Sequence, residues 1–169
     1  RYRQRNVIYH LTGGGFFAHI IASDLPYLLD WSAATGAVVI CPEYALLPEH
    51  VFPAALNEIE EVYRALSSDD AVSILGFETR RVVVSGESAG GNLAAALCVK
   101  ICQEKSSESD GAKKSTDRAM NLPSALMLSC PVLNMSLELS HSRVVGTDDP
   151  VLPSGLLSAI SNAYLPKEL

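Results

Sequence analysis

The chain has 169 residues, a length compatible with one domain, and a formal net charge of −6 at pH 7. Hydrophobic residues account for 48% of it and aromatic residues for 7%, which is typical of a soluble α/β protein. The acidic balance argues against a nucleic-acid-binding surface, and no apolar run approaches the ~20 residues of a transmembrane segment. The composition favours a cytoplasmic protein and is compatible with any oligomeric state.

The first predicted element is a strand over residues 7–10, and three consecutive glycines follow it closely. Three glycines in a row weaken any regular structure, and their natural use is to let backbone N–H groups approach an anionic oxygen. We therefore expect Gly14 and Gly15 to supply such N–H groups. His10, at the end of this strand, fits either a structural histidine or, alternatively, a catalytic base.

A helix over residues 25–35 and a strand over residues 37–40 are predicted next. Ser23 or Asp24 is the expected N-cap of the helix, and Pro26 lies in its first turn. The strand is apolar throughout, which is typical of a parallel sheet that is covered on both faces.

The following predicted helix, over residues 53–66, has one apolar face. Glu58 and Glu61 are expected to face outward, whereas the apolar residues recur at helical spacing and should face the core. These inward positions are Leu56, Ile59, Val62 and Leu66.

The most informative stretch is GESAGG at residues 86–91, between a predicted strand at 81–85 and a predicted helix at 89–104. In a G-x-S-x-G turn the glycines allow the chain to reverse sharply from strand into helix, so that the serine oxygen stands exposed. The helix then aims its first N–H groups and its dipole at that oxygen. Ser88 is therefore the expected nucleophile, and the N–H group of Ala89 is expected in the oxyanion hole.

The last third of the chain contains a polar insertion, a strand and a helix. Residues 104–121 are polar, mixed in charge and aperiodic, which predicts a mobile surface insertion. Residues 125–130 form an apolar strand, and residues 152–164 form a helix with Pro153 at its N-terminus. Apolar strands that alternate with helices predict a three-layer α/β/α fold with a mainly parallel sheet.

The cysteines are not arranged as a disulfide framework or a metal site. All four lie among apolar neighbours, so we expect buried free thiols at Cys41, Cys98, Cys102 and Cys130. Cys98 and Cys102 share a helix face, but nothing near them in the sequence completes a set of metal ligands. No metal is therefore expected.

Several motifs together resemble the hormone-sensitive-lipase-like family of α/β-hydrolases. Residues 44–55, YALLPEHVFPAA, resemble its YRLAPEHPFPAA segment, and residues 86–91 resemble its GDSAGG with Glu in place of Asp. Residues 13–16 are similar to the end of its HGGGF motif, and residues 149–152 and 164–166 to the segment after its sixth strand. Type-B carboxylesterases share GGGF and GESAG but lack the PEHxFPAA element. The resemblance covers nearly the whole chain and implies an α/β-hydrolase fold.

The chain departs from the family pattern in ways that affect the chemistry. Thr12 stands where the family has its HGGG histidine, and its hydroxyl group can take over part of the bracing of this loop. In this fold the catalytic acid and then the histidine follow the serine. No histidine follows His141, which comes too early, and Asp149 resembles part of a linker. Asp148 precedes it in the same linker, and His50 belongs to the PEH element, where a structural role is expected.

The resemblance implies a serine carboxylesterase or lipase-like hydrolase that forms an acyl-enzyme on Ser88. Gly14, Gly15 and Ala89 would hold the oxyanion, the substrate would be a small-molecule ester, and no cofactor is required. We expect residues 1–169 to be a partial α/β-hydrolase catalytic domain, with the acid and the histidine beyond Leu169. The segment alone should therefore have little esterase activity, because its serine lacks a base.

A ligand-binding protein on the same scaffold is the alternative function. The gibberellin receptor resembles this family and keeps the serine elbow, but it has lost the catalytic histidine. The replacement at Thr12 is compatible with such a role.

Overall fold

The structure is a computed structural model that describes residues 2–66, 68–109, 122–138 and 140–166. Within these ranges, one sheet contains four strands in the order β2-β1-β3-β4, and all neighbouring strands are parallel. The strands are β1 (Arg3–Leu11), β2 (Val38–Ile40), β3 (Phe77–Glu87) and β4 (Ala125–Ser129).

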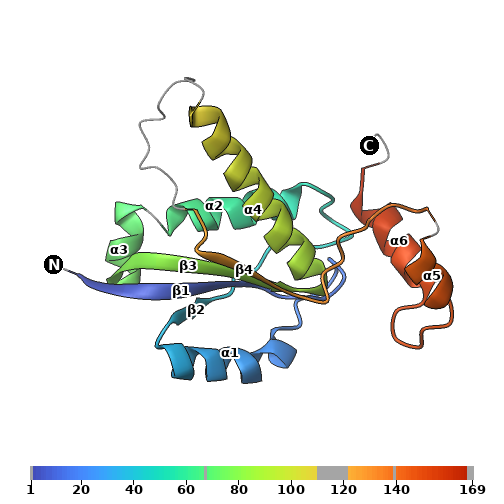
Figure 1. The fold of residues 1–169 in the computed structure, drawn as a ribbon, viewed down its shortest axis with the longest axis horizontal. Coiled ribbons are helices and arrows are strands. Elements are labelled where there is room, and N and C mark those ends of the chain that lie inside the picture. Colours follow the sequence, from blue (N-terminus) through green and yellow to red (C-terminus); the bar gives the residue numbers. More distant parts are fainter. Residues whose placement is uncertain (1, 67, 110–121, 139, 167–169) are drawn as a thin grey trace.

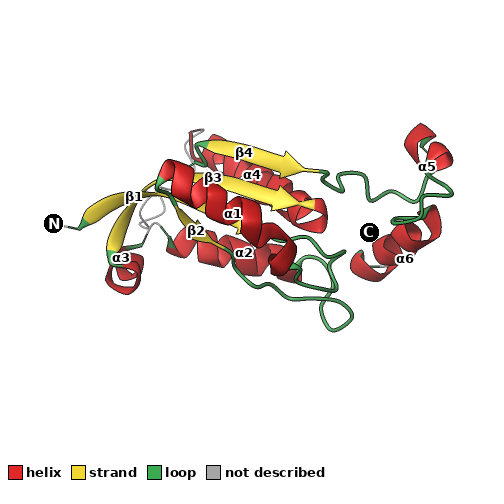
Figure 2. Cartoon of the chain, turned by 90° about the horizontal axis from the view of Figure 1, so that it is seen from below, coloured by secondary structure: helices red, strands yellow, loops and turns green. Residues whose placement is uncertain are grey.

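Helices cover both faces of this sheet, as Figure 1 shows, so the predicted three-layer α/β/α arrangement is confirmed. Helix α1 (Ile21–Thr35) packs on one face, and α2 (Ala54–Ala65), α3 (Asp69–Leu75) and α4 (Ser88–Ser109) lie on the other. Two further helices, α5 (His141–Val145) and α6 (Ser154–Tyr164), lie beyond the carboxyl end of β4 (Figure 2). No helix in the described ranges combines the length and the apolarity that crossing a bilayer requires.

The main core lies between the sheet and the pair of helices α2 and α4. Alternate residues of β1 and β3 face this core because successive strand side chains point to opposite faces. They meet side chains from both helices, and the most buried members are Val7, Tyr9, Leu11, Val82, Val84, Ile59, Tyr63, Leu93, Leu97 and Ile101.

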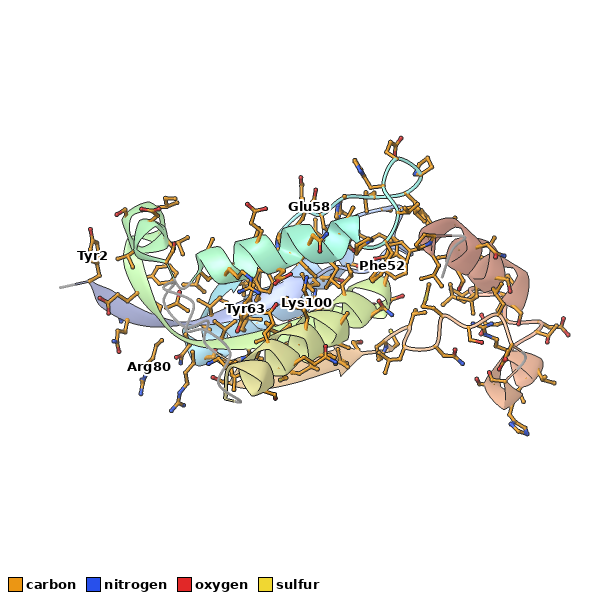
Figure 3. All side chains as sticks on the ribbon, turned by 90° about the horizontal axis from the view of Figure 1, so that it is seen from above. Tyr2, Phe52, Glu58, Tyr63, Arg80 and Lys100 are labelled. Carbon is orange, nitrogen blue, oxygen red and sulfur yellow. The ribbon has the colours of Figure 1, made fainter. Side chains whose placement is uncertain are left out.

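An ion network also joins α2 to α4. Glu60 pairs with Arg64 at 2.5 Å and with Lys100, and Arg64 reaches Glu104 at 2.5 Å. Figure 3 labels Tyr63 and Lys100 where the two helices lie next to each other.

The predicted start of α1 is wrong by four residues, because the helix begins at Ile21. Neither Ser23 nor Asp24 caps it. The Ser23 hydroxyl donates to the carbonyl oxygen of Ile20 at 2.7 Å, and Asp24 is buried inside the helix, where it accepts a hydrogen bond from His10. Asp24 therefore makes a tertiary contact with His10, which a rule based on neighbouring residues cannot predict.

In α2 the predicted inward face is largely correct. Leu56, Ile59 and Leu66 are buried, whereas Val62 is 36% exposed and so does not belong to the core. The buried stripe passes through Tyr63 instead, because its ring packs edge-on against that of Tyr9.

Several other boundaries differ from the predictions. Glu104–Ser109 continue helix α4, so the predicted insertion cannot begin at residue 104, and residues 110–121 lie outside the described ranges. The predicted strand at 125–130 ends at Ser129. The sequence reasoning also missed α3 and α5, which have seven and five residues.

The four cysteines are free thiols, as expected. The expectation that all four are buried is wrong for Cys102 and Cys130, which are exposed. Cys102 lies in α4, and Cys130 follows the end of β4.

Candidate active site

The topology places a crevice at the carboxyl ends of β1 and β3. These strands are neighbours in the sheet, and Leu11, the last residue of β1, pairs with Gly86 of β3. The chain leaves β1 towards α1 on one face and leaves β3 directly into α4 on the other (Figure 1). Connections that diverge to opposite faces open a binding crevice at the strand ends.

Ser88 lies at the sharp turn from β3 into α4. Its φ angle is 52°, in the left-handed region that non-glycine residues rarely adopt. The flanking glycines make the turn possible. A Cβ atom on Gly86 would lie 2.3 Å from the carbonyl oxygen of Gly90, and one on Gly90 would lie 2.1 Å from that of Leu11. The strand, turn and helix expected around GESAGG are therefore present.

The glycine loop after β1 lies against this turn. A Cβ atom on Gly13 would lie 3.4 Å from the Cβ atom of Ser88, so backbone and nucleophile candidate are in close contact. Gly14 and Gly15 have φ angles of 129° and 63°, which favour glycine. The carbonyl oxygen of Gly14 accepts hydrogen bonds from the N–H groups of Phe17 and Ala18 at 3.1 Å, which close the loop.

All four predicted site residues line one cavity of about 700 Å³. These are Ser88, Gly14, Gly15 and Ala89. The remaining wall is mostly apolar and comes from the glycine loop, the segment after β4, and α6, with Phe16, Phe17, Ile20, Val132, Met135 and Ile160 as examples. The cavity is therefore shaped for an apolar group next to a serine hydroxyl, while the roles of these four residues stay predictions.

The loop is braced by residues that the sequence reasoning did not assign to it. Tyr44 donates from its hydroxyl to the carbonyl oxygen of Thr12 at 2.7 Å. His19 donates from Nε2 to the carbonyl oxygen of Tyr44 at 2.9 Å, which leaves Nδ1 to accept from the Thr12 hydroxyl at 3.4 Å. Burial raises the pKa of Tyr44 to about 12, so its hydroxyl stays a donor at neutral pH. Thr12 thus contributes to the bracing through both its backbone and its hydroxyl.

The glycine loop is also fixed from the α6 side. The ring of Phe16 stacks on that of Tyr164 with 3.8 Å between centroids, and the N–H group of Leu47 donates to the carbonyl oxygen of Phe16 at 2.8 Å. Phe52, labelled in Figure 3, packs edge-on against the same tyrosine ring. The PEHxFPAA segment therefore supports the loop by packing and does not itself line the cavity.

Next to the turn lies a polar group that we call the elbow cluster. Its members are His10, Asp24 and Ser85, which are buried, and Tyr27 and Glu87, which are half-buried. His10 contacts Ser85 Oγ through Nδ1 at 2.9 Å and Asp24 Oδ2 through Nε2 at 3.0 Å. Tyr27 donates from its hydroxyl to Glu87 Oε2 at 3.2 Å. His10 is 2% exposed and engaged through both ring nitrogens, so the structure supports the structural reading of this histidine over the catalytic one.

The two carboxyl groups of the elbow cluster have opposite pKa shifts. Burial acts to raise the pKa of Asp24, but the hydrogen bonds from His10 and its other neighbours outweigh burial and hold this pKa below its usual value. Burial, followed by the hydrogen bond and the charge of Asp24, raises the pKa of Glu87. Asp24 is therefore expected to ionise at lower pH than Glu87.

The chain's four histidines lie outside the cavity, whose described lining contains none. His10 and His19 are engaged as above, and His50 and His141 are exposed on a loop and at the start of α5. Asp149 does line the cavity, but its Oδ1 accepts from the N–H groups of Val151 and Leu152 at 2.8 Å. In the described ranges, no three His, Cys, Asp or Glu side chains gather as metal ligands.

Comparisons with known proteins agree with this geometry. Residues 7–169 match the family model described as the alpha/beta hydrolase fold. The chain is 33% identical over 162 residues to hormone-sensitive lipase from Homo sapiens, which covers 96% of this chain and 14% of that protein. It is 29% identical over 163 residues to an esterase from Acinetobacter venetianus, which covers 96% of this chain and 47% of that protein.

Among solved structures, the chain is similar to a bacterial heroin esterase, with a TM-score of 0.77 and 26% identity. This similarity covers 96% of this chain and 46% of that one. The chain thus spans less than half the length of each of these three proteins.

Proposed function

The chain belongs to the alpha/beta hydrolase fold family, and from that premise we propose that the protein hydrolyses carboxylic esters through an acyl intermediate on Ser88. Its relatives include lipases and esterases, which supports a hydrolase of the carboxylesterase class. One observation supports the proposed role of Ser88 in particular. The left-handed serine and the glycine loop meet at the wall of the same cavity.

In the proposed reaction the hydroxyl oxygen of Ser88 attacks the ester carbonyl carbon and forms a tetrahedral intermediate. The backbone N–H groups of Gly14, Gly15 and Ala89 stabilise the negative charge that develops on the carbonyl oxygen. Collapse of the intermediate releases the alcohol and leaves an ester on Ser88. Water then attacks this acyl-enzyme, and the carboxylic acid leaves.

The proton of Ser88 needs an acceptor, and the cavity wall described above contains no histidine. The proposal therefore includes a histidine base and an acid that are supplied by a part of the protein other than residues 1–169. The histidine would take the serine proton and return it to the leaving alcohol, while the acid would orient the imidazole ring.

The alternative of a ligand-binding protein is not favoured. The relatives compared above are named as a lipase and as esterases, and arylacetamide deacetylase from Mus musculus is another relative, at 38% identity over 105 residues. This similarity covers 59% of this chain and 26% of that protein. A receptor would bind an ester without turning it over, so catalytic turnover separates the two functions.

The test is hydrolysis of a series of p-nitrophenyl esters by the protein as its natural gene encodes it. Ser88→Ala should lower kcat by at least ~10³-fold, because no acyl-enzyme can form. Ser124→Ala is the matched control, since this exposed serine precedes β4 at the opposite end of the sheet. Equal activity of wild type and Ser88→Ala would refute the proposed nucleophile.

A further inference from the structure

The cavity that contains Ser88 also contains an arginine. Arg143 of α5 is the one cationic side chain in the described lining, and it is half-buried. Ser88 lies in the turn at the tip of β3, whereas α5 lies beyond the tips of the strands (Figure 2). Neutral polar side chains of the segment around the start of α5 line the cavity as well, namely Asn134, Ser140 and Ser142. The side chains that α6 and the turn before it contribute are mostly apolar, with Val151, Leu152, Leu156, Leu157 and Ile160 among them.

Arg143 is held in place, but its charge has no counter-ion in the described part of the chain. Its Nη2 atom donates to the carbonyl oxygen of Asn134 at 3.2 Å, and its backbone N–H group donates to Oγ of Ser140 at 3.4 Å. Of the ion pairs among the described residues, none includes Arg143. A guanidinium group has five N–H donors in one plane, so most of its donors are left for a ligand.

Three carboxyl groups also line the cavity, and none of them pairs with this arginine. Asp24 and Glu87 belong to the elbow cluster next to Ser88. Asp149 uses its Oδ1 atom to accept two backbone N–H groups of its own loop at 2.8 Å, and it forms no ion pair with Arg143. A negatively charged group of a ligand is therefore repelled from the end of the cavity at Ser88 and attracted to the end at α5.

We propose that Arg143 determines substrate specificity by binding a carboxylate, so that the preferred esters have an apolar chain with a carboxylate group at the end remote from the scissile bond. This inference rests on the proposed function and leaves the proposed reaction at Ser88 unchanged. Arginine can offer a carboxylate two parallel N–H donors, and such charge-assisted hydrogen bonds are stronger than neutral ones. One guanidinium balances one negative charge, which favours a carboxylate over a phosphate dianion.

The test compares anionic esters with neutral esters of nearly the same shape, and it uses the protein as its natural gene encodes it. In the first series the carboxylate is on the acyl chain. Its members are the mono-p-nitrophenyl esters of adipic, suberic and sebacic acids, each compared with the corresponding methyl ester, and their lengths sample the distance from Ser88 to Arg143. In the second series the carboxylate is on the alcohol, and 4-acetoxybenzoate is compared with its methyl ester.

The measured quantity is the ratio of kcat/KM for the anionic ester to kcat/KM for its neutral partner. In at least one series Arg143→Gln should lower this ratio by about 10- to 10²-fold, mainly through KM, because a charge-assisted pair remote from the reacting atoms is lost. Arg143→Lys should lower it less, since lysine keeps the charge but not the planar pair of donors. Arg80→Gln is the matched control, because this exposed arginine of β3, labelled in Figure 3, does not line the cavity, and it should leave the ratio unchanged.

Calorimetric titration of Ser88→Ala with the same pairs of esters measures binding without turnover. The anionic ester should bind more tightly than its neutral partner, and this difference should shrink when Arg143→Gln is added and when the salt concentration is raised. A protein that binds the anionic esters in this way but hydrolyses none of the esters would refute the proposed function and support the carboxylate site. Ratios that are equal in wild type and Arg143→Gln in both series would overturn the inference, even in a protein that hydrolyses the neutral esters. An equal loss for the anionic and the neutral ester would overturn it as well, since that is the effect of a purely structural arginine.

Discussion

Gly90 shows why the turn around Ser88 requires glycine at this position. A side chain at this position would start 2.1 Å from the carbonyl oxygen of Leu11 and 2.4 Å from that of Thr12. Both oxygens belong to the backbone that leads into the glycine loop, so they cannot move without moving that loop. The glycine therefore sets the distance between Ser88 and the proposed oxyanion donors.

We expect Gly90→Ala to lower kcat/KM by about 10²-fold, because α4 and Ser88 must shift away from the end of β1. The same strain should destabilise the protein by about 1–3 kcal/mol. Ester hydrolysis and urea unfolding check both effects. Gly155→Ala is the matched control, since a Cβ there meets nothing within 4 Å, and it should leave activity unchanged. Full activity of Gly90→Ala would contradict this account.

The site could be predicted only in part at the residue scale. Ser88, Gly14, Gly15 and Ala89 could be proposed from the sequence because two local motifs demand unusual backbone geometry around them. The elbow cluster was not found, because His10 and Asp24 are 14 residues apart and His10 and Ser85 are 75 apart. Contacts between residues so far apart in the sequence depend on the order of the strands in the sheet, and no short sequence motif predicts them.

At the scale of elements, long periodic segments were predictable and short ones were not. The apolar stripe of α2 and the apolar run of β3 reflect burial between the sheet and its helices, so their positions followed from periodicity. The apolar run of β4 also predicted a strand, although most of its side chains are exposed. Helix α3 has seven residues and α5 has five, which is too short for a helical period to appear. The start of α1 was predicted wrongly because aspartate is a residue type favoured at helix N-caps. In the structure Asp24 is instead a buried hydrogen-bond acceptor inside the helix.

The ion network between α2 and α4 should contribute a pH-dependent stability. Burial acts to raise the pKa of Glu60, but the hydrogen bonds and charges of Lys100 and Arg64 outweigh it and lower this pKa. A depressed pKa contributes stability above the ordinary value of 4.5, and the contribution disappears as pH falls through the folded value. The cations are 38–43% exposed, which reduces the strength of the pairs.

We therefore expect Glu60→Gln to lower the free energy of unfolding by about 1–2 kcal/mol at neutral pH, between the values for exposed and buried pairs. The difference from wild type should shrink as pH falls below about 4.5. Urea denaturation at several pH values measures it, with Glu61→Gln as the exposed control. A difference that stays constant down to acidic pH would show that the network does not act through ionisation.

At the scale of the whole molecule, the sheet of the described residues has an apolar edge. Leu126 and Met127 of β4 are 42% and 41% exposed, although β4 is an all-parallel strand of the kind that is usually buried. An exposed apolar edge strand favours pairing between chains. Residues 1–169 are therefore expected to associate when they are expressed alone.

Light scattering of residues 1–169 expressed alone should reveal species larger than a monomer, and Leu126→Lys should reduce them, because an edge charge opposes strand pairing. Ile74→Lys, at a residue that is 83% exposed outside the sheet, is the control and should leave association unchanged. A monodisperse monomer of the unmodified segment would contradict the expectation.

Covalent labelling of the natural gene product with a fluorophosphonate, followed by mass mapping of the peptides, tests the central claim most directly. An activated serine beside oxyanion donors reacts with such a probe, and an ordinary surface serine does not. The account predicts one adduct, on Ser88, that disappears in Ser88→Ala and persists in Ser124→Ala. An adduct on another residue, or none in a protein that hydrolyses esters, would contradict it.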